Sequence, residues 1–203
     1  YCKNVGIALK EDFHLSYPFL FEDGKELYMC PETHQAKDIR LYRCIEFPLK
    51  WKFVKTLMSA VSAVDTNIFY KDKKWWLMTN LSYGSIEDHG SQMHLFSNEN
   101  LLSENWVSHS KNPVIFDPFL SRNAGFIKDS GYHYRVFQRP GFNNYGESLG
   151  VARIEKLNND SYVEVVDFEV LPDFFKELHG THTYNFNDGL LALDFLKISK
   201  TKN

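Results

Sequence analysis

One phrase occurs four times in this chain of 203 residues, and the repeat constrains the fold more than any other feature. The first copy, residues 16–33, reads SYPFLFEDGKELYMCPET. Its first half alternates apolar and polar residues, which is typical of a half-buried strand, and its Asp-Gly pair favours a tight turn. The other copies read VDTNIFYKDKKWWLM, RNAGFIKDSGYHYRVF and THTYNFNDGLLALDFL. Each copy therefore predicts a β-hairpin.

The spacing of the copies predicts how the hairpins are arranged. The turn aspartates Asp23, Asp72, Asp129 and Asp188 are separated by 49, 57 and 59 residues. A β repeat of roughly 40–50 residues is typical of a propeller blade, in which four antiparallel strands form one sheet. We therefore predict an all-β fold, a β-propeller, in which each copy supplies the two strands nearest the central channel. The aromatic content of 16% agrees, because aromatic residues favour strands.

The strand patterns between the copies divide a single domain into blades. We expect blades over residues 13–59, 60–114 and 121–171, and a partial last blade over residues 181–198. Residues 1–12 begin without an initiator methionine, and Val5, Ile7 and Leu9 stand at alternate positions, as in a strand. We interpret this segment as the last strand of an earlier blade. The chain is then expected to be a fragment, with a further segment upstream in the parent protein.

Composition excludes several classes of function. A formal net charge of −3 gives no basic surface for nucleic acid, and no apolar run approaches the ~20 residues of a membrane helix. The three cysteines, Cys2, Cys30 and Cys44, lack the spacing of a metal site. We expect them to be reduced thiols, which favours a cytoplasmic location. No phosphate loop, nucleophile elbow or HExxH motif is present, so no cofactor is predicted.

Propeller sites lie at the mouth of the channel, where the first strand of a blade begins and the second ends. The candidates at these points are Tyr17, Glu32, His34, Asp65, Asn80, Arg122, Arg135, Gln138 and His182. Because the two strands are antiparallel, we predict that the side chains of Glu32, Asp65, Arg122 and Gln138 converge on one rim. Asp65 and Arg122 open consecutive copies, so we expect an ion pair that keeps Asp65 ionised. For each candidate, a structural bond between blades is the alternative interpretation.

Two further motifs give weaker signals. Trp75 and Trp76 could form a sugar-stacking face, but strand alternation sends the two rings to opposite sides of the sheet, so at least one belongs to the core. His179 and His182 have the spacing of a metal pair without a third ligand nearby. We therefore predict no metal site.

Four longer strings resemble a known family. They are HLSYPFLFEDGKELYMCPET, VDTNIFYKDKKWWLMTN, LFSNENLLSENWVSHSKNPV and RNAGFIKDSGYHYRVFQ, the last followed by YGESLGV. Together they resemble propeller domains related to glycoside hydrolase family 43. They are most similar to the N-terminal domain of the glucosamine inositolphosphorylceramide transferases and their bacterial relatives. The resemblance covers almost the whole chain and implies a five-bladed propeller with a carbohydrate site at its centre. It also implies a larger parent protein with a sugar-modifying catalytic domain.

The resemblance also bears on catalysis. Glycosidases of this type use a pair of carboxylates, with a third acid that tunes and orients. Asp65 matches the tuning acid, whereas the position expected for the general acid lies in Ser121-Arg122-Asn123-Ala124-Gly125, which holds no carboxylate. The base is expected in the missing first blade. An arginine suits a carboxylate or phosphate ligand and does not donate the proton of glycoside hydrolysis.

Three functions remain open from the sequence. The favoured one is a non-hydrolytic, carbohydrate-binding propeller that serves a sugar-transferring or sugar-modifying parent. Its predicted ligand-binding residues are Arg122, Gln138, Tyr17, His34, Asn80 and His182. The second is an active glycoside hydrolase with Asp65 and Glu32 as its carboxylates. The third is a structural or protein-interaction propeller.

Overall fold

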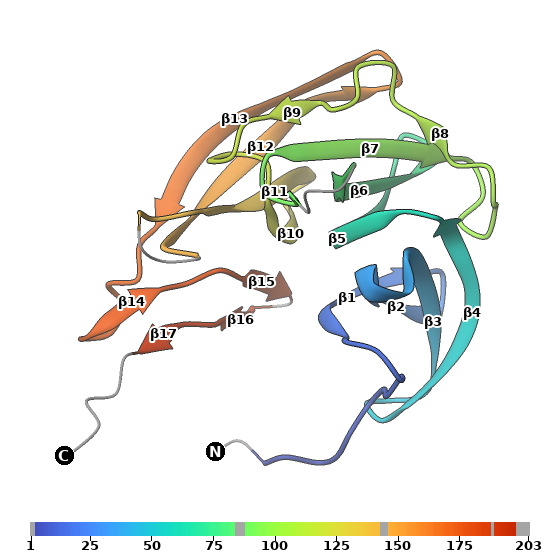
Figure 1. Ribbon diagram of the computed structural model, residues 1–203, viewed down its shortest axis with the longest axis horizontal. Coiled ribbons are helices and arrows are strands. Elements are labelled where there is room, and N and C mark those ends of the chain that lie inside the picture. Colours follow the sequence, from blue (N-terminus) through green and yellow to red (C-terminus); the bar gives the residue numbers. More distant parts are fainter. Residues whose placement is uncertain (1–2, 84–87, 143–145, 188, 198–203) are drawn as a thin grey trace.

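The structure is a computed structural model that describes residues 3–83, 88–142, 146–187 and 189–197. It is almost entirely β: the only helix among these residues is the three-residue 3₁₀ helix η1 (His34–Ala36). Three antiparallel sheets and a final pair of short ladders are arranged as an arc around a common centre (Figure 1). The innermost strands β1, β5, β10 and β15 lie next to one another around this centre. This is the arrangement of propeller blades.

The first sheet contains the first copy of the repeat. Its strand order is β1 (Ser16–Asp23), β2 (Glu26–Glu32), β3 (Asp38–Glu46) and β4 (Lys50–Ser59). Asp23 pairs with Glu26 across a two-residue turn in which Gly24 has a φ of 62°. That backbone conformation is open to glycine at little steric cost, which explains why the Asp-Gly pair reverses the chain here.

The next two sheets contain the second and third copies. The second consists of β5 (Ser62–Lys71), β6 (Lys74–Ser82), β7 (Gln92–Asn98), β8 (Val107–Ser108) and β9 (Ile115–Phe116), and both β8 and β9 pair with β7. The third has the order β10 (Asn123–Asp129), β11 (Tyr132–Arg139), β12 (Ser148–Asn158) and β13 (Ser161–Val170). Asp72 and Asp129 lie at their hairpin turns, as the repeat predicts.

The fourth copy forms two short antiparallel ladders. β14 (Leu178–Gly180) pairs with β17 (Leu196–Lys197), and β15 (Tyr184–Asn187) pairs with β16 (Leu190–Leu193). The fourth turn aspartate, Asp188, lies outside the described residues.

The N-terminal segment differs from its prediction. Residues 3–15 contain no strand, and the side chains of Val5 and Ile7 are 60% and 76% exposed. Alternation alone does not make a strand, because the backbone groups need a neighbouring strand as hydrogen-bond partner, and none of the described strands pairs with this segment.

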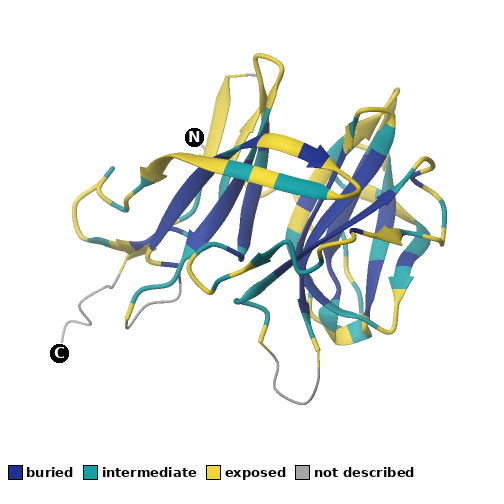
Figure 2. Cartoon of the chain, turned by 90° about the horizontal axis from the view of Figure 1, so that it is seen from above, coloured by how far each residue is buried: buried dark blue, intermediate teal, exposed yellow. Residues whose placement is uncertain are grey.

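The core lies between successive sheets rather than at one point. One apolar cluster joins Leu41 and Leu57 of the first sheet to Ile68 and Leu77 of the second. A second cluster joins the second and third sheets, and a third joins the third sheet to Tyr184 and Leu193 of the last hairpin. Figure 2 shows the buried residues running through the middle of the sheets. A buried side chain of this size contributes about 1.5–3 kcal/mol, so each blade depends on its neighbour.

The two adjacent tryptophans and the cysteines were also singled out in the sequence. Trp75 and Trp76 are 6% and 2% exposed and pack into different clusters, so both rings are core residues. Cys30 and Cys44 are free thiols, and Cys2 lies outside the described residues. Within the described ranges, no helix is long and apolar enough to span a membrane.

Candidate functional site

A cavity of about 490 Å³ lies where the inner strands begin. All four copies of the repeat contribute to its walls, which are formed by His14, Ser16, Tyr17, Pro18, Phe19, Glu32, Asp65, Arg122, Gln138, His182, Thr183 and Asn185. The four residues that the repeat places on one rim, Glu32, Asp65, Arg122 and Gln138, are all among them. The lining combines carboxylate, guanidinium, amide, hydroxyl and imidazole groups with an aromatic wall.

β-bulges in two of the inner strands, β1 and β5, direct side chains into the cavity. The register of β1 shifts between Ser16 and Phe19, and that of β5 shifts between Val64 and Asn67. Tyr17 and Asp65 stand in these bulges with positive φ values of 43° and 49°. Non-glycine residues in this conformation are uncommon and concentrate at functional sites.

The bulges also correct the predicted alignment of the copies. Counted back from the residue pair that closes each hairpin, Tyr17, Asp65 and Asn123 hold the same position, and Arg122 stands one residue earlier. The prediction that Asp65 and Arg122 are equivalent is therefore wrong by one residue. The turn aspartates misled the count because Asp72 lies inside its turn, whereas Asp129 closes the preceding strand.

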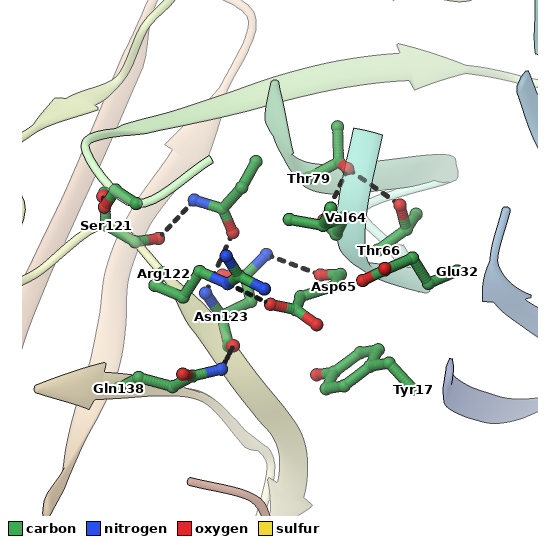
Figure 3. Close-up of polar contacts among 12 residues, drawn as sticks. Tyr17, Glu32, Val64, Asp65, Thr66, Thr79, Ser121, Arg122, Asn123 and Gln138 are labelled. Carbon is green, nitrogen blue, oxygen red and sulfur yellow. Dashed lines mark hydrogen bonds and ion pairs between the residues drawn. The ribbon is translucent and has the colours of Figure 1, made fainter. Parts of the chain in front are cut away.

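Asp65 and Arg122 form an ion pair between the second and third sheets (Figure 3). The Arg122 Nε–H donates to Asp65 Oδ2, and Asn123 Nδ2 donates to the Asp65 carbonyl oxygen at 3.0 Å. Asp65 is 4% exposed. Burial raises the pKa of its carboxyl to about 6, and Glu32 adds to the rise, although Arg122 opposes it. The expected ion pair with Arg122 is present, but burial outweighs its effect on the pKa, so Asp65 loses its proton only above about pH 6.

Glu32 and Tyr17 form the wall on the first sheet. Glu32 is 8% exposed, and its Oε1 lies 2.9 Å from Nδ1 of His34, so His34 contacts a lining residue without lining the cavity itself. The Tyr17 hydroxyl donates to Asn67 Oδ1 at 2.8 Å. Burial, reinforced by the charge of Asp65, raises the pKa of Tyr17 well above its usual value, so this hydroxyl stays protonated.

Asn80 does not reach the cavity. It holds the same position at the end of the second strand as Glu32 and Gln138, but its side chain is fully buried. Its Nδ2 donates to the carbonyl of Ser121 at 2.8 Å, and its Oδ1 accepts from the backbone N–H of Asn123 at 2.9 Å. Asn80 thus connects the second sheet to the third. This is the structural bond between blades that was the alternative interpretation for each candidate. Arg135 is likewise fully buried, beneath the cavity rim.

His182 enters the cavity from the last hairpin, held by Asp194. The Nδ1–H of His182 donates to Asp194 Oδ2, while Asp194 Oδ1 accepts the backbone N–H groups of His182 and Thr183 at 2.9 and 2.8 Å. The hydrogen bond that His182 donates to Asp194 raises the pKa of His182. Sequence reasoning missed Asp194, which directly follows β16 and whose only signal is its place near His182 across the last hairpin. It also missed six residues that line the cavity, which are His14, Ser16, Pro18, Phe19, Thr183 and Asn185.

Replacing Asp194 by asparagine is expected to lower the pKa of His182, because the anionic acceptor of its Nδ1–H is lost. A pH titration of the His182 ring signal by NMR measures this shift. Asp72→Asn, in a turn at the far end of β5 from Asp65, is the matched control. An unchanged His182 titration in Asp194→Asn would show that this carboxylate does not govern the ring.

No metal site accompanies these groups. Among the described residues, no group of three histidine, cysteine, aspartate or glutamate side chains could hold a metal ion.

Comparison with known proteins places this geometry in context. The family model for the N-terminal region of glucosamine inositolphosphorylceramide transferase 1 matches residues 2–198. Glucosamine inositolphosphorylceramide transferase 1 of Arabidopsis thaliana is 36% identical over 165 residues, which cover 79% of this chain and 21% of that protein. The protein of the same name from Oryza sativa subsp. indica is 36% identical over 169 residues, covering 79% and 22%. The chain therefore spans about a fifth of the length of these relatives.

Solved structures with the same fold are glycoside hydrolases. The arabinanase of Bacillus subtilis superposes with a TM-score of 0.58 at 15% identity, covering 90% of this chain and 65% of the enzyme. An exo-β-1,3-galactanase of Phanerochaete chrysosporium, solved with β-1,3-galactotriose, gives a TM-score of 0.63 at 10% identity, covering 92% and 44%. At these identities the likeness shows the fold alone, which is the β-propeller of glycoside hydrolase family 43.

Proposed function

The chain belongs to the family of the N-terminal domain of glucosamine inositolphosphorylceramide transferase 1, and from this premise we propose that it is a carbohydrate-binding propeller of a larger sugar-transferring protein. The domain has a glycosidase-like fold in a transferase family. Binding of a carbohydrate or glycoconjugate in the cavity is the new element of the proposal. The activity of the whole protein and its further domains are part of the same proposal, because the chain spans only a fifth of its relatives.

The observation that carries this proposal is the Asp65–Arg122 pair in the cavity wall. In the glycosidase pattern, the general acid is expected where β10 begins, in the region Ser121 to Gly125. Here a guanidinium occupies that region and contacts Asp65. A guanidinium cannot donate the proton that departure of a glycosidic oxygen requires, but it can bind hydroxyl or anionic groups through directed hydrogen bonds.

The rest of the lining supports binding. The amides of Gln138 and Asn185 and the hydroxyls of Ser16 and Thr183 are suited to the hydroxyl groups of a sugar, and Phe19 adds an apolar surface. A small number of placed polar groups in a partly apolar concave site is typical of ligand pockets.

An active glycoside hydrolase is the second candidate, and one observation favours it. Glu32 and Asp65 line the same cavity, and a carboxyl with a pKa of about 6 is able to act as a general acid near neutral pH. Hydrolysis with inversion requires two carboxyl groups about 6.5–9.5 Å apart with room for water, and retention a pair about 5–5.5 Å apart. Asp65 would be the acid and Glu32 its partner.

Replacing Arg122 by alanine in the full-length protein is expected to weaken glycan binding at least about tenfold, which corresponds to about 1.4 kcal/mol. Calorimetric titration with xylotriose, β-1,3-galactotriose and glucosamine measures the affinity, and reducing-end release measures hydrolysis in the same samples. Arg153→Ala, which removes a surface ion pair of the third sheet with Asp167, is the control.

Asp65→Ala decides between the two candidates. Loss of binding without any turnover in the native protein supports the binding function. If the native protein hydrolyses a glycoside, and Asp65→Ala abolishes turnover while binding survives, the hydrolase interpretation replaces it. If no probe binds to the native protein or to any variant, the carbohydrate-binding proposal fails for these sugars.

A further inference from the structure

Arg135 of β11 is the largest fully buried side chain among the described residues. Its guanidinium faces Glu164 of β13 in a two-point contact, Nε to Oε2 at 2.8 Å and Nη2 to Oε1 at 2.5 Å. The Tyr162 hydroxyl donates to the same carboxylate. The charge of Arg135 is therefore balanced within the third sheet by a partner that is itself hydrogen-bonded.

The remaining donors of Arg135 point at the backbone that carries Arg122. Its Nη2 donates to the carbonyl oxygen of Leu120 at 2.7 Å, and its Nη1 lies 3.4 Å from the carbonyl oxygen of Ser121. The same Nη1 lies 3.5 Å from Oδ1 of Asn123. Arg135 thus contacts the chain on both sides of Arg122.

Gln138, three residues further along β11, also donates hydrogen bonds to the segment that contains Arg122. Its backbone N–H donates to the carbonyl of Arg122 at 2.8 Å, and its Nε2 donates to the carbonyl of Asn123 at 3.0 Å (Figure 3). Four consecutive carbonyl groups, those of residues 120–123, therefore accept hydrogen bonds from Arg135 or Gln138. The segment that presents Arg122 is fixed from beneath by one strand.

A salt bridge kept only for stability would not need this geometry. Replacing a buried ion pair by apolar residues of similar volume is often neutral or stabilising, so burial of Arg135 and Glu164 alone does not explain their presence. The planar guanidinium, with five donors in a fixed fork, can bind a carboxylate on one edge and carbonyl groups on the other. Lysine offers the same charge without that second edge.

We infer that Arg135, anchored by Glu164, is a positioning residue that holds Arg122 in place to contact Asp65 in the cavity. The inference rests on the proposed function only where it assumes that Arg122 contacts a ligand. The positioning itself is a property of the protein without ligand.

The test is Arg135→Lys in the full chain, read out through the titration of Asp65. A carboxyl-carbon NMR titration follows Asp65, with Asp65→Asn to assign its signal. Arg122 opposes the effect of burial on Asp65, so a displaced Arg122 is expected to raise the pKa of Asp65 by about half a unit or more. Arg153→Lys, which conserves a surface ion pair of the same sheet, is expected to leave the titration unchanged.

The outcomes separate positioning from stability. A folded Arg135→Lys variant with a lower melting temperature but an unchanged Asp65 pKa overturns the inference, because the arginine then only stabilises the blade. If this variant does not fold, Tyr162→Phe removes one hydrogen bond to Glu164 and gives a milder test, in which a raised Asp65 pKa supports the inference and an unchanged one refutes it. Neither result depends on ligand binding, so failure of the proposed function remains distinguishable.

Discussion

Asparagine at position 65 is expected to abolish a pH-dependent change of about 3 kcal/mol in the free energy of unfolding. The carboxyl of Asp65 has a pKa of about 6 in the folded chain and 3.8 as its reference value, and each pH unit between the two is worth about 1.4 kcal/mol. The folded state therefore takes up the proton at a higher pH than the unfolded state does. The native chain gains stability from this group as the pH falls from 7 to 4, with most of the gain between pH 6 and pH 4.

Denaturant unfolding at a series of pH values measures the effect. The charge of Asp65 also raises the pKa of His182, so the difference between the native chain and Asp65→Asn reports the titration of Asp65 together with this coupled group. Asp72→Asn, in an exposed turn of the same sheet, is the control. Parallel curves for the native chain and Asp65→Asn would mean that Arg122 fully offsets the burial of the carboxyl.

This titration has a consequence for the proposed ligand site. Below about pH 6 the protonated Asp65 accepts only a hydrogen bond without charge assistance from Arg122, so this contact in the cavity wall becomes weaker. A ligand held by the ion pair would bind differently above and below this pH. The chain keeps a buried carboxylate at a cost in stability, which is typical of a functional site rather than of a structural bond.

The repeat made the architecture predictable because its signals are local. A two-residue turn and alternating apolar residues are encoded in each copy, so the hairpins around Asp23, Asp72 and Asp129 follow from the sequence alone. The convergence of Glu32 and Asp65 on one cavity follows from the same repeat, because equivalent strand ends meet at one rim.

The properties that the sequence did not reveal depend on packing between blades. Asn80 holds the same strand position as Glu32 and yet is buried against Ser121, a contact that no periodic pattern encodes. The raised pKa of Asp65 reflects desolvation by residues from several sheets. Val5, Ile7 and Leu9 alternate as in a strand, but pairing needs a neighbouring strand that the pattern cannot supply. The role of Asp194 depends on its contacts with His182 and Thr183, which form only when the last hairpin is folded.

The last hairpin meets the third sheet at Gly125. Gly125→Ala is expected to lower the free energy of unfolding by about 3 kcal/mol or more. Gly125 has a φ of 155°, and a Cβ there would lie 2.0 Å from the backbone carbonyl oxygen of Tyr184. A backbone oxygen cannot move aside as the end of a flexible side chain can. The added methyl group must therefore push β15 away from β10.

The displaced strand carries part of the cavity wall. Thr183 and Asn185 flank Tyr184, and His182 precedes them, so the same substitution is expected to weaken glycan binding as well as the fold. Thermal unfolding and calorimetric titration measure the two effects. Gly131→Ala is the control: its φ of 83° is also unfavourable for alanine, but no atom lies within 4 Å of the added carbon. The free energy of unfolding of Gly131→Ala is expected to fall by only about 1 kcal/mol.

The comparison of the two glycine variants separates backbone strain from contact. If Gly125→Ala costs much more than Gly131→Ala and glycan binding falls with it, the close approach of β10 and β15 holds the fourth side of the cavity in place. Equal costs would show that β15 tolerates the methyl group, and that His182 is held instead by its own hairpin through Asp194. Weak destabilisation combined with lost binding would place the critical displacement at Thr183 and Asn185, because these residues flank the contact and contribute directly to the cavity wall.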